Sequence, residues 1–210
     1  MFAKWPFVLV ALLLPVAGYA QDKPVARIAP APAQPSDPIL KQMFDAIRSR
    51  GAEPLNMHLT LGNAPKLFKA YADLAFAIRA ADVPRAHREL IILRTTYLSG
   101  GEYETAQHRP MALSCGLTRA QLDAIADWKN SSVFDAPQQA ILAYADEMAA
   151  EKGVSEATFA ALSKFFNPKE IVELTISADF YAAAARVTKA LEVQLEKGAG
   201  LETNAYGQCR

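Results

Sequence analysis

The sequence predicts an all-α protein of roughly seven to nine helices joined by short connections. Three observations support this fold class. Helix start signals recur along the chain, glycines stand where helices are expected to end, and Ala-rich and Leu-rich segments repeat apolar residues three and four positions apart. The alternating pattern that is typical of β-strands is not found, so we do not expect a mixed fold.

The expected helix starts carry side chains that can cap exposed backbone N–H groups. Ser155 is expected to cap a helix that runs to about Lys164. Gly116 and Gly153 fall at expected helix ends, because glycine readily adopts the left-handed conformation found there. Capping boxes, in which two side chains cap each other's backbone N–H groups, are expected at Thr118 with Gln121, Asp135 with Gln138, and Asn167 with Glu170.

Three longer helices are expected to supply the core. One begins at Asp82 and Pro84, runs to about Ser99, and is apolar on nearly all sides, which is typical of a buried helix. A second, from about Ala64 to Arg79, carries an apolar stripe formed by Leu67, Tyr71, Leu74 and Ile78. A third begins at Pro168, and its stripe is formed by Ile171, Leu174, Ala178, Tyr181 and Ala185.

Four segments are expected along the chain. Residues 1–20 have the positive start, apolar run and small-residue cleavage site of a signal peptide cut after Ala20. An uncleaved anchor is the alternative, although the apolar run is short for a membrane span. Residues 21–38 predict a Pro-rich linker, residues 39–197 one helical domain, and residues 198–210 a frayed tail. We therefore expect a periplasmic or secreted protein without stable membrane insertion.

Charge and cysteine content exclude several classes of function. Lys and Arg total 22, as do Asp and Glu, and removal of Lys4 with the signal peptide leaves a net charge of −1. No basic stripe is present, so we expect no nucleic-acid partner. Cys115 and Cys209 lack the spacing of a metal or redox motif. Export would permit a disulfide between them, but the place of Cys209 in the expected tail favours two unpaired cysteines.

The most informative segment is a helix expected from about Glu102 to Cys115. At 100° per residue, Glu104 and His108 share its apolar face, whereas Glu102 and Arg109 lie nearly opposite. If both side chains point inward, the imidazole and the carboxylate form an acid–base pair. The alternative is an exposed Glu–His pair four residues apart, which would contribute only about 0.3–0.5 kcal/mol.

Glu89 lies on the preceding apolar helix, where a buried carboxylate needs a cation or a hydrogen-bond donor. His108 could supply that donor, and a structural ion pair with Arg88, Arg94 or a residue of another helix fits equally well. Glu104 and His108 give only two metal ligands on one helix, whereas a catalytic zinc site needs three. We therefore expect no metal and no cofactor.

Five stretches resemble the carboxymuconolactone decarboxylase family, which also contains the alkylhydroperoxidase D (AhpD) proteins. The likeness covers about residues 50 to 190. It implies the helical bundle of that family and a homo-oligomer, either a trimer or a hexamer. The matching stretches are Arg88–Arg94, Gly101–His108, Cys115–Leu122, Ala140–Glu147 and Glu170–Leu174.

In the peroxidase branch of this family, a Glu is followed by a CxxC pair and then a His. Glu89 and His108 match the Glu and the His, but the two cysteine positions are occupied by Gly101 and Glu104. Disulfide-exchange chemistry requires a thiolate and a resolving partner. The chain therefore looks like the decarboxylase-like branch, in which a Glu and a His replace the redox pair.

This resemblance implies an acid–base site acting on a small organic acid or lactone, as a lyase or isomerase. His108 would be the general acid and base, Glu104 would orient its imidazole, and Glu89 would be a second relay carboxylate. Tyr103 or Arg94 would anchor a substrate carboxylate. The alternatives are a peroxiredoxin-like activity of the shared domain and a non-catalytic binding or scaffold protein.

Overall fold

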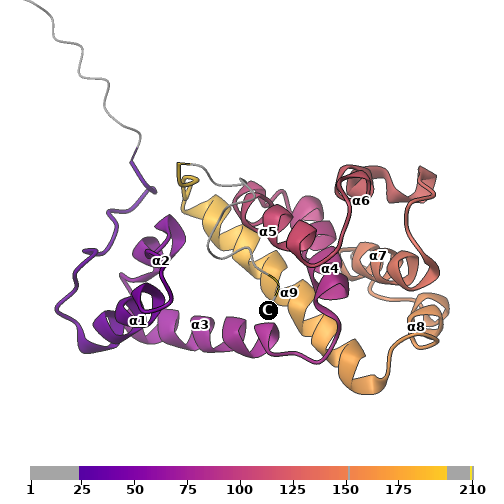
Figure 1. The fold of residues 1–210 in the computed structure, drawn as a ribbon, viewed down its shortest axis with the longest axis horizontal. Helices are drawn as coiled ribbons and strands as arrows, with labels where there is room; N and C mark the ends of the chain where they lie inside the picture. Colours follow the sequence, from indigo (N-terminus) through magenta and orange to yellow (C-terminus); the bar gives the residue numbers. More distant parts are fainter. Residues whose placement is uncertain (1–23, 151, 198–208, 210) are drawn as a thin grey trace, which may run out of the picture.

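Prolines, capping side chains and glycines fix where the helices begin and end. The computed structural model describes residues 24–150, 152–197 and 209, and this part of the chain is helical, without β-strands (Figure 1). The predicted all-α fold class is confirmed. The described residues form nine α-helices: α1 Pro38–Arg48, α2 Asn56–Leu61, α3 Pro65–Arg79, α4 Arg85–Leu98, α5 Glu102–Ser114, α6 Arg119–Ala124, α7 Ala136–Met148, α8 Glu156–Leu162 and α9 Pro168–Ala190.

The three predicted capping boxes are present. The side chains of Thr118 and Asp135 each accept a hydrogen bond from the backbone N–H three residues later, and the glutamine there caps in return. Asn167 accepts from the N–H groups of both Lys169 and Glu170 at the start of α9. The glycines that follow α5 and α7 have φ angles of 99° and 71°, a region that favours glycine.

Helix α4 lies at the centre of the larger hydrophobic core. It packs against α5, α7 and α9, and these neighbours surround it (Figure 1). Leu90, Ile91, Ile92 and Leu93 are all nearly fully buried as a result. The predicted stripe of α9 is also buried, from Ile171 to Ala185. The local apolar pattern therefore predicted the central helices correctly.

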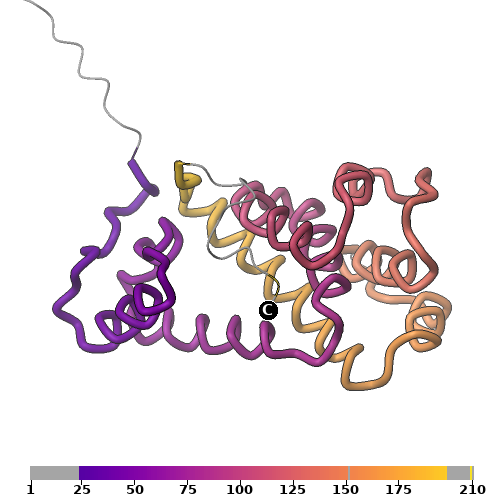
Figure 2. The backbone as a smooth tube through the Cα atoms, in the orientation of Figure 1, coloured from indigo at the N-terminus to yellow at the C-terminus, as the bar shows by residue number. Residues whose placement is uncertain are grey.

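A smaller core lies away from α4, where α1 and α2 pack against α3 (Figure 2). The two cores are separate clusters, and α3 connects them because its far end reaches α9. The buried side chains of the smaller core are Ala31, Leu40, Phe44 and Phe68.

The predicted core stripe of α3 is partly wrong. Ile78 is buried and the ring of Tyr71 packs on Phe180 with 4.6 Å between centroids, but Leu67 is 75% exposed and Leu74 is 43% exposed. Helix α3 directs Phe68 toward the smaller core, and Tyr71 and Ile78 pack in the larger one. Leu67 and Leu74 share the stripe of Tyr71 and Ile78 but belong to neither core.

The described part of the Pro-rich segment before α1 lies against the domain. Over its described part, residues 24–37, it runs without helix alongside the domain (Figure 2). The N–H of Arg27 donates to the Leu191 carbonyl at 2.7 Å, and the N–H of Ala31 donates to the Leu59 carbonyl at 2.8 Å. Small alanine side chains can fit into the surface there, and Ala31 is buried. This segment is therefore bonded to the folded domain.

The predicted signal peptide and, apart from Cys209, the predicted tail lie outside the described residues. Within the described chain, no helix has both the length and the apolar character that a membrane span requires.

Candidate functional site

The candidate site is centred on a hydrogen bond between α4 and α5. The Nδ1 atom of His108 lies 2.7 Å from Oε2 of Glu89, and both residues are buried, with 6% and 2% of their surfaces exposed. The two helices pack directly against each other, which places the two side chains face to face. The predicted inward orientation of His108 and its contact with Glu89 are therefore present in the structure.

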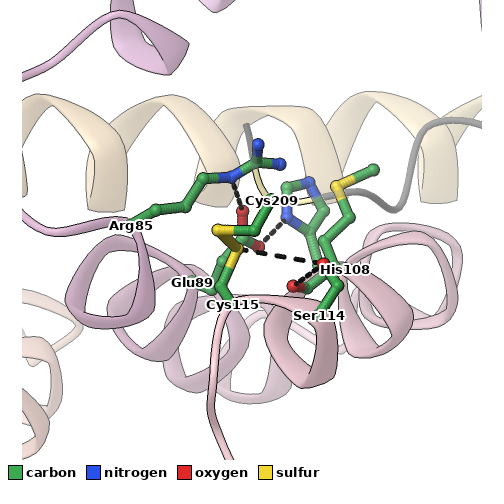
Figure 3. Close-up of a disulfide and its surroundings, with 7 residues drawn as sticks. Arg85, Glu89, His108, Ser114, Cys115 and Cys209 are labelled. Atoms are coloured by element: carbon green, nitrogen blue, oxygen red, sulfur yellow. Dashed lines mark hydrogen bonds and ion pairs between the residues drawn. A yellow bond between two sulfur atoms is a disulfide. The ribbon is translucent and has the colours of Figure 1, made fainter.

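Glu89 also binds Arg85, a partner that the sequence reasoning missed. Its Oε1 atom accepts a hydrogen bond from Nε of Arg85 at 3.1 Å (Figure 3). Burial opposes ionisation of Glu89, but the charges and hydrogen bonds of His108 and Arg85 outweigh it and hold its pKa below the ordinary value. Arg85 is four residues before Glu89 on one helix, and this spacing is the signal that could have identified the pair.

The ionisation state of Glu89 determines which nitrogen of the His108 imidazole carries the proton. An ionised carboxylate can only accept hydrogen bonds, so Nδ1 of His108 must donate to it. In the neutral imidazole, the lone pair is then on Nε2. Among the described residues, no hydrogen-bond partner is found for Nε2. The imidazole therefore presents a basic nitrogen whose opposite side is held by a carboxylate.

Glu104 is buried on the same face of α5, but it does not orient His108 as predicted. Its two carboxylate oxygens accept from the Thr188 hydroxyl of α9 at 2.8 and 3.0 Å. Burial raises the pKa of Glu104, and the Thr188 hydrogen bond only partly offsets this. The orienting role expected of Glu104 is taken by Glu89, because the hydroxyl of Thr188 draws the Glu104 carboxylate toward α9.

Aromatic side chains form another side of the site. The ring of Tyr181, from α9, lies edge-on to the imidazole of His108 with 4.5 Å between centroids. Burial raises the pKa of Tyr181 to about 12, so its hydroxyl stays protonated at neutral pH. It was predicted only as a core residue. A buried tyrosine can supply both an apolar wall and a polar hydroxyl.

The two predicted substrate anchors have other partners. The Arg94 guanidinium donates to Asp146 at 2.6 Å and to the carbonyls of Ile125 and Ala126. The Tyr103 hydroxyl donates to Glu196 at 2.7 Å. Arg94 therefore ties α4 to α7 and the turn after α6. These contacts leave neither side chain directed at the Glu89–His108 pair.

Neither position that matches the CxxC pair holds a thiol, and the first has no room for a side chain. Gly101 lies against α9, and a Cβ atom added there would stand 2.6 Å from Cβ of Ala185 and 3.1 Å from Oε2 of Glu104. Real Cβ atoms essentially never approach another atom below 3.0 Å. The close approach of α9 therefore requires glycine at the first position, and a carboxylate that binds Thr188 occupies the second.

The cysteines form a disulfide, which corrects the expectation that they are unpaired. Cys115 follows α5 directly, and it is bonded to Cys209 with 5.0 Å between the Cα atoms. Figure 3 shows this disulfide with Arg85, Glu89 and His108 in its surroundings. The bond joins residues 94 positions apart, so the chain-entropy model gives it on the order of 4 kcal/mol. Sequence distance alone could not predict this pairing, because spatial proximity decides it.

Metal-ligating side chains do not gather in the described part of the chain. No group of three or more His, Cys, Asp or Glu residues there could hold a metal ion. Glu89 and His108 bind each other, and Glu104 binds Thr188. The Glu89–His108 pair can accept a proton at Nε2 of His108 and return it.

Comparison with known proteins relates this site to a family. Residues 65–147 match the model of the carboxymuconolactone decarboxylase family. No curated protein gives a significant match. The matched segment contains α3 to α5 and therefore both Glu89 and His108.

Solved structures with a similar fold are distant in sequence. A peroxidase-related protein with an AhpD core from Ralstonia eutropha JMP134 is 20% identical, with a TM-score of 0.74 over 90% of this chain and 100% of its own. The debrominase Bmp8 is 19% identical, with a TM-score of 0.70 over 88% of this chain and 98% of its own.

A protein of unknown function from Agrobacterium tumefaciens, described as related to the antioxidant defence protein AhpD, is 22% identical. Its TM-score is 0.63 over 65% of this chain and 95% of its own. At these identities the likeness concerns the fold. Together these findings show that residues 65–147 match the carboxymuconolactone decarboxylase family and that the described chain has the AhpD-like helical fold.

Proposed function

We propose that this chain is an exported enzyme that uses His108 and Glu89 for acid–base chemistry on a small organic acid or lactone, as a lyase or isomerase. The observation that carries the proposal is the buried 2.7 Å hydrogen bond between His108 and Glu89. It leaves Nε2 of the imidazole as the reactive atom. The enzymatic character of the debrominase with a similar fold also supports this choice over a scaffold protein.

In the proposed reaction, Nε2 of His108 removes a proton from a carbon next to a carbonyl group. The C–H bonding electrons move into the carbonyl and form an enolate, and the imidazole becomes an imidazolium. Glu89 stabilises this cation through the Nδ1 hydrogen bond, and Arg85 fixes the position of Glu89. The imidazolium then returns the proton to a carbon of the substrate. In a decarboxylation no carbon-bound proton is removed first: the electrons of the bond to the carboxylate move into the neighbouring carbonyl as carbon dioxide leaves. The enolate then takes a proton from an imidazolium, which water reprotonates afterwards.

A peroxidase of the CxxC type is less well supported. That chemistry needs a thiolate beside a resolving cysteine, but Gly101 and Glu104 stand at the matching positions. Cys115 and Cys209 are joined in a disulfide, so neither offers a free thiol in this state. A peroxidase would have to use these two cysteines, and blocking them in the reduced protein would then remove hydroperoxide turnover.

The test is carbon–hydrogen exchange in deuterium oxide, followed by NMR across a panel of small lactones and keto acids. The mature protein should accelerate exchange for at least one compound. His108→Gln should slow that exchange by about 100-fold or more, because a positioned general base contributes about that much. His87→Gln is the matched control, since His87 lies edge-on to Phe166, away from the pair. Equal exchange by the wild type and His108→Gln would refute the assignment.

The proposal includes export and self-association. A disulfide persists in oxidising compartments such as a bacterial periplasm, which supports export of a mature chain beginning after Ala20. Exposed apolar side chains on α3 support a homo-oligomer. N-terminal sequencing of the protein recovered from a periplasmic fraction tests the first point, and an intact Met1 there would contradict it.

A further inference from the structure

The carboxylate of Glu196 is bound by three hydrogen-bond donors near the start of α5. Its Oε1 atom accepts from the Tyr103 hydroxyl at 2.7 Å and from the backbone N–H of Asn56 at 2.6 Å. Its Oε2 atom accepts from the side-chain amide of Gln107 at 2.6 Å. The donors belong to α2 and α5, whereas Glu196 lies in the irregular segment after α9. These contacts therefore form a cradle for both oxygens of a carboxylate.

Contacts other than those with Glu196 also position the Tyr103 donor. Tyr103 is 5% exposed and packs in a small cluster with Ala26 and Val193. Its hydroxyl oxygen accepts from the Met57 N–H at 3.3 Å, which leaves the hydroxyl proton for the carboxylate. Burial raises the pKa of Tyr103, and the charge of Glu196 raises it further, so the hydroxyl stays a donor at neutral pH. The cradle is therefore pre-organised to receive an oxyanion.

Glu196 is more exposed than the side chains that bind it. Tyr103 and Gln107 are buried, whereas Glu196 is partly exposed. The backbone beside it is fixed, because the Gln194 N–H donates to a carbonyl of the N-terminal segment and the Gln194 carbonyl accepts from the Asn56 side chain. Rotation of the Glu196 side chain alone would therefore open a path from solvent to the buried donors while the surrounding chain stays in place.

The three donors of the cradle are neutral groups. By contrast, the buried carboxylate of Glu89 and that of Asp146 are bound by guanidinium groups. Hydrogen bonds from a hydroxyl and two amides can be made equally to the carboxylate of another molecule. Neutral donors also favour the single charge of a carboxylate over the larger charge of phosphate, because they offset less of the cost of removing a charge from water. The cradle therefore suits a carboxylic acid.

From this arrangement we propose that Tyr103, Gln107 and the Asn56 N–H form a binding site for the carboxylate of a small organic acid, and that Glu196 is an internal ligand which such an acid displaces. The acid must be small, because the donors lie within reach of one glutamate side chain. Tyr103 and Gln107 are four residues apart on one face of α5, and His108 lies about 100° further round the helix. The site therefore goes beyond the proposed acid–base function and does not rest on it.

The test is a titration of the mature protein with acetate at pH 7 and constant ionic strength, followed by NMR of the Gln107 side-chain amide. Acetate corresponds to the part of the side chain that Glu196→Ala removes. The wild type should bind acetate weakly, because acetate must displace Glu196. Glu196→Ala should bind acetate at least about tenfold more tightly, because the internal competitor is gone. A residue with only a structural role would not give this gain in affinity.

Glu192→Ala is the matched control. It removes an exposed carboxylate of the same segment, which is paired with Arg27, and it should bind acetate as the wild type does. Tyr103→Phe, added to Glu196→Ala, deletes one donor and should weaken acetate binding at least about tenfold. Acetamide, which is neutral, should bind to Glu196→Ala more weakly than acetate. If circular dichroism shows that Glu196→Ala does not fold, Glu196→Gln replaces it, since its amide keeps the volume but opposes the Gln107 amide.

A wild type whose Gln107 resonance does not respond to acetate would overturn the proposal, even if Glu196→Ala binds acetate, because Glu196 would then not be displaced. Equal acetate affinity of the wild type and Glu196→Ala would overturn it as well. Acetate binding that is unchanged by Tyr103→Phe would place the acid elsewhere and have the same consequence. None of these results bears on proton exchange at His108, so the two proposals fail independently.

Discussion

Two buried glutamates of one helical pair carry opposite shifts in pKa. Glu89 is held ionised because His108 and Arg85 both bind it. For Glu104, the hydrogen bonds from Thr188 and from its own backbone, together with the effect of His108, do not outweigh burial. The difference arises from the partners, since both residues are almost completely buried. Each shift has a distinct consequence for the pH dependence of folding.

Glu89→Gln should destabilise the protein by about 3–5 kcal/mol near neutral pH, because it leaves Arg85 and His108 without their carboxylate. The folded-state pKa of Glu89 lies below its ordinary value of 4.5, so its contribution is fully present above that value. It is lost as the pH falls through the lower folded pKa. Urea unfolding from pH 7 to pH 3 should show the wild type approaching the mutant in stability. If the stability difference between the wild type and Glu89→Gln grows toward acid pH, the pKa of Glu89 is not lowered in the folded protein.

Glu104→Gln should become more stable relative to the wild type as the pH rises, which is opposite to the behaviour of Glu89→Gln. The folded-state pKa of Glu104 is raised, so ionisation is harder in the folded protein and the wild type loses stability as the pH rises above 4.5. Glutamine cannot ionise but keeps an oxygen that accepts from Thr188. The melting temperature of the mutant, relative to the wild type, should therefore rise between pH 4.5 and pH 8. If the difference in melting temperature between the mutant and the wild type stays constant across that range, burial does not raise the pKa of Glu104.

At the scale of the elements, the site depends on how closely α9 packs on α5. The contact of Gly101 with Ala185 sets this approach, and it allows Thr188 to reach Glu104 and Tyr181 to reach His108. The disulfide fixes the other end of α5 through Cys115. Helix packing and the crosslink together hold the imidazole in one position.

Gly101→Ala should destabilise the protein by about 1–3 kcal/mol, because the added methyl group would overlap the Ala185 side chain. The double variant Gly101→Ala with Ala185→Gly should recover part of this loss, since the colliding methyl group is removed. A double-mutant cycle from thermal unfolding measures the recovery. If the two changes are simply additive, the close approach of the two helices is not what requires glycine.

At the scale of the whole molecule, α3 joins the two larger hydrophobic cores of the described chain, and Leu67 and Leu74 on that helix are left exposed. Leu67, Tyr71, Leu74 and Ile78 are spaced by four, three and four residues, as in helices that pack against other helices. The face that carries Leu67 and Leu74 is therefore the part of the surface that best fits the proposed homo-oligomer.

Leu67→Glu should convert the proposed oligomer into a smaller species, because the charge would have to be buried in the contact. Light scattering coupled to size-exclusion chromatography measures the change. Lys66→Glu, one residue earlier on the exposed surface, is the control and should have little effect. A wild type that is monomeric at micromolar concentration would contradict the proposal, and Leu67→Glu would then change stability by less than about 0.5 kcal/mol.

The sequence predicted the elements well because their signals are local. Capping boxes, first-turn prolines and glycine ends act within four residues, and the all-apolar helix around Leu90 could only be buried. The helical repeat also placed Glu104 and His108 on the inward face of α5. For α3 the same reasoning was incomplete, because periodicity shows that a face is apolar but does not show what covers it.

The sequence by itself therefore determined the helical fold, the burial of the central helices and the inward direction of the acidic and imidazole side chains. Only the tertiary structure decided the partners. In the folded protein, His108 is hydrogen-bonded to Glu89, and Glu104 accepts a hydrogen bond from Thr188. Arg94 is bonded to Asp146, and Cys115 forms a disulfide with Cys209. Helix formation depends on neighbours along the chain, whereas hydrogen bonds and disulfides between helices depend on distances of a few ångströms that packing alone sets.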